Sequence, residues 1–134
     1  MLIKDVMTDH VITIESNESI LEACNKYKNY DVGCLIVTKE NSIVGIITER
    51  DIIERAIVNQ KNPEETKVEE IMSEEIKTIY DTDSIEKAAE KMKMYKLKKL
   101  PVITKEEDLV GIITATDIAN TLPKITKMIK EDEE

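Results

Sequence analysis

Hydrophobic positions along the chain follow the same order of patterns twice. Short apolar stretches typical of strands lie at 11–14, 34–37 and 43–47, and again at 76–79, 100–103 and 109–113. Between the first two stretches of each set, apolar residues recur at i, i+3, i+4 and i+7, the spacing of an amphipathic helix. These residues are Ile20, Ala23, Cys24 and Tyr27 in the first set and Ile85, Ala88, Ala89 and Met92 in the second.

A second helix is predicted after the third strand of each set. In the first set its inner face is expected to carry Ile52, Ile53, Ala56 and Ile57. Asp83 with Glu86 has the spacing of an N-terminal cap for the helix that contains Ile85. Each set therefore predicts the order β-α-β-β-α, with a three-stranded sheet covered by helices.

The two sets are copies of one unit. The segment GIITERDI at 45–52 returns as GIITATDI at 111–118, and Met7 aligns with Met72 when one copy is laid over the other. The alignment shifts by a single position after Val37 and Val102, because the second copy is longer in a polar turn. One copy alone would have a marginal core. We therefore expect an α/β fold (α+β in some schemes) of two repeats packed sheet to sheet with pseudo-two-fold symmetry.

Composition shifts set the expected boundaries of these repeats. The first domain is predicted at 1–58 and the second at 68–122, joined by a polar linker at 59–67 that contains Pro63. Residues 123–134 are expected to form an amphipathic segment, with Ile125, Met128 and Ile129 at helical spacing, followed by an acidic tail.

The overall composition narrows the class of protein. The chain has 134 residues and a net charge of −9, with no apolar run long enough for a bilayer and no apolar leader. A soluble, cytoplasmic protein is expected, and its acidity disfavours binding to the phosphates of a nucleic acid. Cys24, Cys34 and His10 do not have the spacing of metal ligands, so neither a metal site nor a required cofactor is predicted.

The repeated phrase has two interpretations. In the first, Thr48-x-x-Asp51 and Thr114-x-x-Asp117 are capping boxes at the starts of helices, with Asp in place of the usual Glu. Gly45 would then be a strand residue that allows another backbone to approach closely, and Gly111 likewise.

In the second interpretation the same geometry forms a ligand site. A helix start offers free N–H groups to a phosphate, and a carboxylate one turn into the helix can accept hydrogen bonds from ribose hydroxyls. Arg50 and Thr116, the two variable positions, would add a forked cation in one copy and a hydroxyl in the other.

The sequence resembles tandem CBS (cystathionine-β-synthase) domains, the pair known as a Bateman module. The resemblance is carried by the GhhT-x-x-D phrase that closes each copy, by VGCLIVT at 32–38 and by KKLPVIT at 98–104. It covers the chain from Ile3 to about Leu122. Two such phrases, each after a matching strand pattern, are far more specific than one.

The resemblance implies a regulatory module that binds AMP, ADP, ATP or S-adenosylmethionine in clefts between the two sheets and signals to a separate effector. It implies that Asp51 and Asp117 hold ribose and that Thr48 and Thr114 contact ribose or phosphate. Adenine would lie against Val11, Ile12 and Val32 in one copy and against Ile76, Lys77 and Leu97 in the other. Many members have a basic or histidine pair where this chain has Lys98-Lys99, whereas the first copy has Gly33-Cys34 there, so the two sites are expected to be unequal.

Other classes of function remain as alternatives. A nucleic-acid-binding CBS pair and a ligand-free dimerisation module use the same fold. An enzyme is not expected, because the sequence shows no nucleophile with its base, no paired carboxylates and no Gly-rich phosphate loop. The resemblance also implies a homodimer formed through the helices, and the apolar residues in excess of a two-sheet core are Ile53, Ile57, Met94, Ile118 and Leu122.

Overall fold

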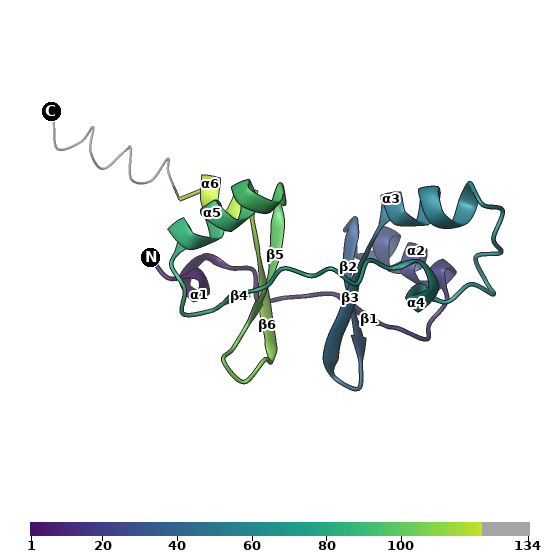
Figure 1. Cartoon of the computed structure of the whole chain (residues 1–134), viewed down its shortest axis with the longest axis horizontal. Helices are drawn as coiled ribbons and strands as arrows, with labels where there is room; N and C mark the ends of the chain where they lie inside the picture. The colour runs from purple at the N-terminus through teal and green to yellow at the C-terminus, as the bar shows by residue number, and fades with distance from the viewer. Residues whose placement is uncertain (122–134) are drawn as a thin grey trace, which may run out of the picture. The chain divides into compact units, whose positions relative to one another are not determined.

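The computed structural model describes residues 1–121 and contains two three-stranded sheets, each with strands in sequence order (Figure 1). The elements of the first half are α1 (Ile3–Val6), β1 (Thr13–Glu15), α2 (Ile20–Tyr30), β2 (Cys34–Lys39), β3 (Ser42–Thr48), α3 (Glu49–Ile52) and a π-helix (Ile53–Ile57). Those of the second half are α4 (Val68–Ile71), β4 (Ile79–Tyr80), α5 (Ile85–Tyr95), β5 (Lys99–Ile103), β6 (Leu109–Thr114) and α6 (Ala115–Ala119).

The two sheets have the same topology. In the first, β1 is parallel to β2, and β2 is antiparallel to β3. In the second, β4 is parallel to β5, and β5 is antiparallel to β6. The predicted α/β class and the β-α-β-β-α order of each copy are therefore confirmed, while sheet-to-sheet packing stays a prediction.

The compact units do not follow the order of the repeats in the sequence. One unit consists of Ile12–Ile76, and the other joins Met1–Val11 to the chain from Lys77 onward. Each repeat begins with a leading segment, residues 3–11 in the first copy and 68–76 in the second. Each leading segment packs with the other copy, so that purple α1 lies among green elements and teal α4 among blue ones (Figure 1).

Backbone hydrogen bonds fix each leading segment in place. Ser73 and Ile46 exchange two bonds of 2.9 Å, which attach the second leading segment to β3. Thr8 and Ile112 do the same at β6, also at 2.9 Å. The start of each segment is bonded as well, and Val68 N–H donates to the Glu18 carbonyl at 2.8 Å.

The repeated glycines lie under these leading segments. A Cβ atom on Gly45 would lie 2.5 Å from Met72 Sδ and 2.9 Å from the Ser73 carbonyl oxygen. On Gly111 it would lie 2.6 Å from Met7 Sδ and 2.8 Å from the Thr8 carbonyl oxygen. Neither glycine has a positive φ. Glycine is therefore required here by the space between two backbones, as the sequence indicated.

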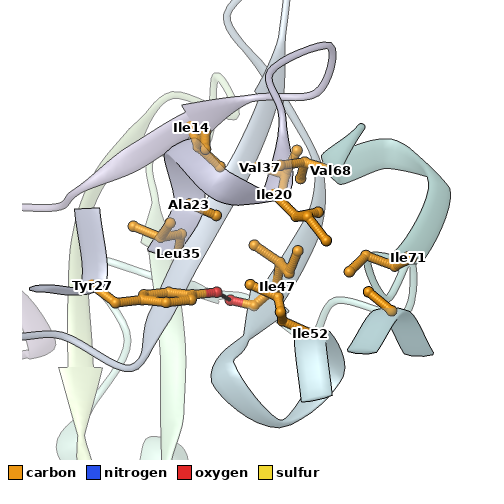
Figure 2. Packing of buried hydrophobic residues seen from close by; sticks show 11 residues of the cluster. Ile14, Ile20, Ala23, Tyr27, Leu35, Val37, Ile47, Ile52, Val68 and Ile71 are labelled. Atoms are coloured by element: carbon orange, nitrogen blue, oxygen red, sulfur yellow. Dashed lines mark hydrogen bonds between the residues drawn. The ribbon is translucent and has the colours of Figure 1, made fainter. Parts of the chain in front are cut away.

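Each unit has its own hydrophobic core. The first is built on Ile14, Ile20, Leu35 and Ile47, all 1% exposed or less (Figure 2). Tyr27 closes it, and its hydroxyl donates to the Ile47 carbonyl at 3.0 Å, which confirms its predicted place in the core (Figure 2). The leading segments contribute to both cores, through Val68 and Ile71 in this one and through Ile3 in the second.

Several local predictions were wrong. The first strand of each copy begins later and is shorter than the predicted 11–14 and 76–79. Only Thr13–Glu15 pair with β2, and only Ile79–Tyr80 pair with β5. Ala89 is exposed, since the buried stripe of α5 is narrower than the apolar spacing suggested. Ser84, not Asp83, caps α5 by accepting from Lys87 N–H, while the Asp83 carboxylate accepts from Tyr80 N–H.

The predicted inner face of the helix after Thr48 was partly wrong. Ile52 and Ala56 are buried, as predicted, but Ile53 is 57% and Ile57 51% exposed. One apolar stripe of this segment, Ile52 and Ala56, therefore lies against the core, and the adjacent stripe lies in solvent. The predicted helix around Ile125 lies outside the described residues. Among the residues that are described, no helix has the length and apolar character to cross a bilayer.

The glycine contacts generate the first prediction. Gly45→Ala and Gly111→Ala should each lower the free energy of unfolding by about 1–3 kcal/mol, because the new methyl group meets a backbone oxygen held in a bridge. Gly33→Ala is the matched control, since its Cβ would meet only the flexible Glu49 side chain, at 3.2 Å. Urea denaturation of the three variants measures this, and equal losses at all three positions would contradict it.

Candidate functional site

The predicted site residues of the first copy gather at one end of its sheet. β1 and β2 are parallel and begin at this end, while antiparallel β3 finishes there. Cys34, at the start of β2, is the register partner of Thr48, and Glu49 N–H donates to the Gly33 carbonyl at 3.1 Å. Ile12 and Val32 are partly buried and pack against the first core. The turn into α3 therefore lies beside the start of β2.

The second copy repeats this arrangement. Lys99 is the register partner of Thr114, and Ala115 N–H donates to the Lys98 carbonyl at 2.8 Å. Leu97 is partly buried and packs against the second core. The side chains of Lys98 and Lys99 are exposed.

Reciprocal hydrogen bonds form both capping boxes. Thr48 Oγ1 accepts from Asp51 N–H at 3.1 Å, and Asp51 Oδ2 accepts from Thr48 N–H at 3.0 Å. Thr114 and Asp117 make the same pair of bonds, both at 3.0 Å. The capping interpretation is thus realised in full. Each box uses the Oδ2 oxygen of its carboxylate, and Asp51 keeps 17% of its side chain exposed.

Three other predicted residues, Arg50, Thr116 and Lys77, are exposed. Arg50 Nε lies 2.7 Å from Glu54 Oε1, and the Arg50 side chain is 83% exposed. The hydrogen bond to Glu54 and its negative charge raise the pKa of Arg50. Thr116 is exposed, and the ammonium group of Lys77 lies 4.6 Å from the centre of the Tyr95 ring.

Residues that were predicted to contact the same adenine belong to different compact units. Val11 belongs to the unit of the second sheet, although Ile12 belongs to the first. Ile76 belongs to the unit of the first sheet, although Lys77 belongs to the second.

The structure also adds residues that the sequence analysis missed. Lys26 Nζ donates to the Thr13 carbonyl and Lys91 Nζ to the Thr78 carbonyl, both at 2.8 Å, which ties α2 and α5 to the chain at the sheets. The two lysines occupy equivalent positions of the two copies, so a comparison of the copies could have identified them from the sequence. Arg55 is the third addition. Its Nε lies 3.8 Å from Asp51 Oδ1, and it has no equivalent in the second copy.

Cys24 has a packing role. Both cysteines are partly buried, and Cys24 packs against the first core. Burial, and secondarily the charge of Glu49, raises the pKa of the Cys24 thiol. The thiol is therefore kept in its neutral, less nucleophilic form.

Comparison with known proteins identifies the family. The model of the CBS domain matches residues 3–57 and 68–124. The CBS domain-containing protein YhcV of Bacillus subtilis is 33% identical over 117 residues, which are 87% of this chain and 82% of that protein. The L-aspartate semialdehyde sulfurtransferase of Methanocaldococcus jannaschii is 34% identical over 119 residues, which are 88% of this chain but 22% of that enzyme.

A solved structure shows the same fold with ligands bound. The CBS domain pair of protein MJ0100, in complex with 5-methylthioadenosine and S-adenosyl-L-methionine, is 31% identical to this chain. The TM-score is 0.80, and the match covers 92% of this chain and 97% of that pair. Among the curated relatives, the match spans 82% of YhcV but only 22% of the sulfurtransferase. The sulfurtransferase therefore has regions that this chain does not match.

Both the duplicated structure and the two family matches lead to one assignment: the chain belongs to the CBS domain family and carries two CBS domains in tandem.

Proposed function

We propose that this CBS pair is a regulatory module that binds adenosine-containing ligands at its two Thr-x-x-Asp turns and signals to a separate protein. The observation that carries the proposal is the duplicated capping box, in which each carboxylate is fixed at a helix start through Oδ2 while Oδ1 takes no part in the cap. A rigid acceptor loses little conformational entropy on binding. The MJ0100 pair, which binds 5-methylthioadenosine and S-adenosyl-L-methionine, supports the same class of ligand here.

The sheet end beside each turn supplies the rest of the proposed site. Partly buried apolar side chains, Ile12 and Val32 in the first copy and Leu97 in the second, offer surface to an adenine ring. Thr48 and Thr114 provide hydroxyls next to the carboxylates. The start of β5 adds two exposed lysines, so phosphate or carboxylate groups of a ligand are favoured at the second copy.

The two copies should differ in ligand preference. The start of β2 is neutral at Gly33-Cys34, whereas the start of β5 carries Lys98 and Lys99. We therefore assign neutral or cationic adenosine compounds, such as 5-methylthioadenosine, to the first turn. Compounds with a phosphate tail, such as AMP, ADP or ATP, are assigned to the second.

The dual role of the aspartates generates the second prediction. Asp117→Asn should leave the melting temperature nearly unchanged without ligand, because an amide oxygen can still accept from Thr114 N–H. It should weaken the binding of AMP at least tenfold, since a charged hydrogen bond to ribose contributes about 1.5–3 kcal/mol. Calorimetric titration and thermal melting measure the two effects. A variant that melts much lower and binds AMP as before would reduce the aspartate to a helix cap.

The capping threonines provide the matched contrast. Thr114→Ala removes the acceptor for Asp117 N–H and should cost about 1 kcal/mol of stability, equivalent to a decrease in melting temperature of about 3–5 °C. Asp117 is preferred to Asp51 for the first test, because Asp51 also contacts Arg55 and its replacement would change two interactions.

A homodimer is the third prediction. Ile53, Ile57 and Val58 are 57%, 51% and 68% exposed and form an apolar surface of the π-helix and its end. Such a surface is typical of one that another chain covers. Met94 is 70% exposed, as expected, but Ile118 packs against the second core and Leu122 lies outside the described residues.

Light scattering measures the assembly. The unmodified chain should have the mass of a dimer at high micromolar concentration, and the double variant Ile53→Glu, Ile57→Glu should have the mass of a monomer. Tyr80→Glu, at a 40% exposed apolar residue in the other unit, is the control that should stay dimeric. A monomeric unmodified chain would refute the assignment of this surface.

A further inference from the structure

Arg55 contacts three acceptors in the first unit, which contains the first sheet. Its Nη1 donates to the Ile71 carbonyl at 3.0 Å and to the Met72 carbonyl at 3.3 Å. Its Nε lies 3.8 Å from Asp51 Oδ1. The guanidinium group thus fills the space between the end of α4 and the capping box, where a carboxylate and two carbonyl oxygens converge.

The second unit contains the same acceptors in the same framework. Val6 and Met7 align with Ile71 and Met72 in the repeat, and Asp117 aligns with Asp51. Their surroundings match as well, since Met7 covers Gly111 as Met72 covers Gly45. Both leading segments form the same isolated bridge to the strand beside them. The repeat therefore places three equivalent acceptors around an equivalent space.

The residue that would fill this space is different. Thr121 stands at the position of the second copy that aligns with Arg55. Its hydroxyl donates to the Ile118 carbonyl at 2.7 Å, so the short side chain is turned to its own helix. Within residues 1–121, no side chain takes the place of the guanidinium group at the Val6 and Met7 carbonyls.

A cavity of the second unit is lined by three of the aligned residues, Val6, Asp117 and Thr121. It has a volume of about 390 Å³ and is lined by Met1, Asp5, Val6, Asp117, Asn120 and Thr121. Among residues 1–121, its lining includes two carboxylates and no lysine or arginine. No cluster of three or more residues suited to a metal ion is found within the described part of the chain. The cavity therefore favours an organic cation over a metal ion.

We propose that this cavity of the second unit binds the guanidinium group of an arginine-like ligand, in the position that Arg55 occupies in the first unit. A guanidinium group is preferred to an ammonium group because its planar fork can reach a carboxylate and two carbonyl oxygens at once. The ligand is either a free alkylguanidine or an arginine side chain presented by another molecule, and both offer the same group. The cavity shares Asp117 with the proposed adenosine site, but a guanidinium group can bind there whether or not adenosine compounds bind.

The test uses agmatine as the probe, in the absence of nucleotide, with the amide resonances of the full chain followed by NMR. Agmatine should cause saturable shifts at Asn120 and Thr121, with a Kd on the order of 10 mM, as expected for one small group in an open site. Putrescine has a similar length and also carries cationic ends but lacks the fork, so it should shift these resonances much less. N-acetylarginine amide distinguishes the sources: binding equal to that of agmatine favours a presented side chain, and weaker binding favours a free ligand.

Two variants test the cavity: one should fill it in the second unit, and the other should create an equivalent cavity in the first. Thr121→Arg supplies the guanidinium group from the chain itself, so it should raise the melting temperature and abolish the agmatine shifts. Arg55→Thr should lower the melting temperature and create a second set of shifts around Asp51. Shifts that persist in Thr121→Arg, or that agmatine and putrescine produce alike, overturn the proposal. Because Asp117 lines this cavity and also belongs to the proposed adenosine site, AMP is titrated into separate samples without agmatine.

Discussion

The close approach of two backbones over a glycine is the contact on which the rest of the structure depends. Gly45 and Gly111 let the leading segments lie flat on β3 and β6, where two hydrogen bonds of 2.9 Å fix each segment. This contact places Val68 and Ile71 in one core and Ile3 in the other. It also brings the carbonyls of the leading segment beside the capping box of the adjacent helix. Packing, capping and the candidate sites thus share a single geometric requirement.

The capping boxes show how one set of residues can serve both folding and recognition. Asp51 and Asp117 each use Oδ2 to close a helix start, which holds the rest of the carboxylate in a defined position. A cap needs only one oxygen, so the stabilising role does not exhaust the group. The copies then diverge around this shared centre, through Arg55 on one side and the exposed Lys98 and Lys99 on the other. Duplication followed by such changes gives one fold two chemically distinct turns.

The sequence was informative wherever the pattern was repeated and local. The two hairpins, α2, α5 and the capping boxes follow from apolar spacing and from the duplicated phrase, because these depend on neighbours in the chain. The helices α1 and α4 have four residues each, too few to show a period. Their exchange between the copies could not be predicted either. Met7 and Met72 are equivalent, so either could cover either glycine, and only the three-dimensional structure decides.

The faces of the helix after Asp51 show a second limit. Ile52, Ile53, Ala56 and Ile57 are all apolar, and an ordinary helix with this sequence could bury all of them on one broad side. In the structure only Ile52 and Ala56 are buried, while Ile53 and Ile57, each one position further along, are exposed. Arg55 was missed for a related reason. Its three acceptors come from the leading segment of the other copy and from the capping box, and no local pattern in the sequence links them.

The exchange of the leading segments has a consequence for the order in which the chain can fold as it is synthesised. Residues 3–11 are made long before their partner strand β6, which ends at Thr114, so an early segment is among the last to find its place. The unit of the first sheet, by contrast, is complete once residue 76 has left the ribosome. Ile3 must therefore wait with its side chain exposed while most of its own unit is still to come. A ribosome-bound intermediate of this protein is thus one finished unit preceded by an unattached apolar segment.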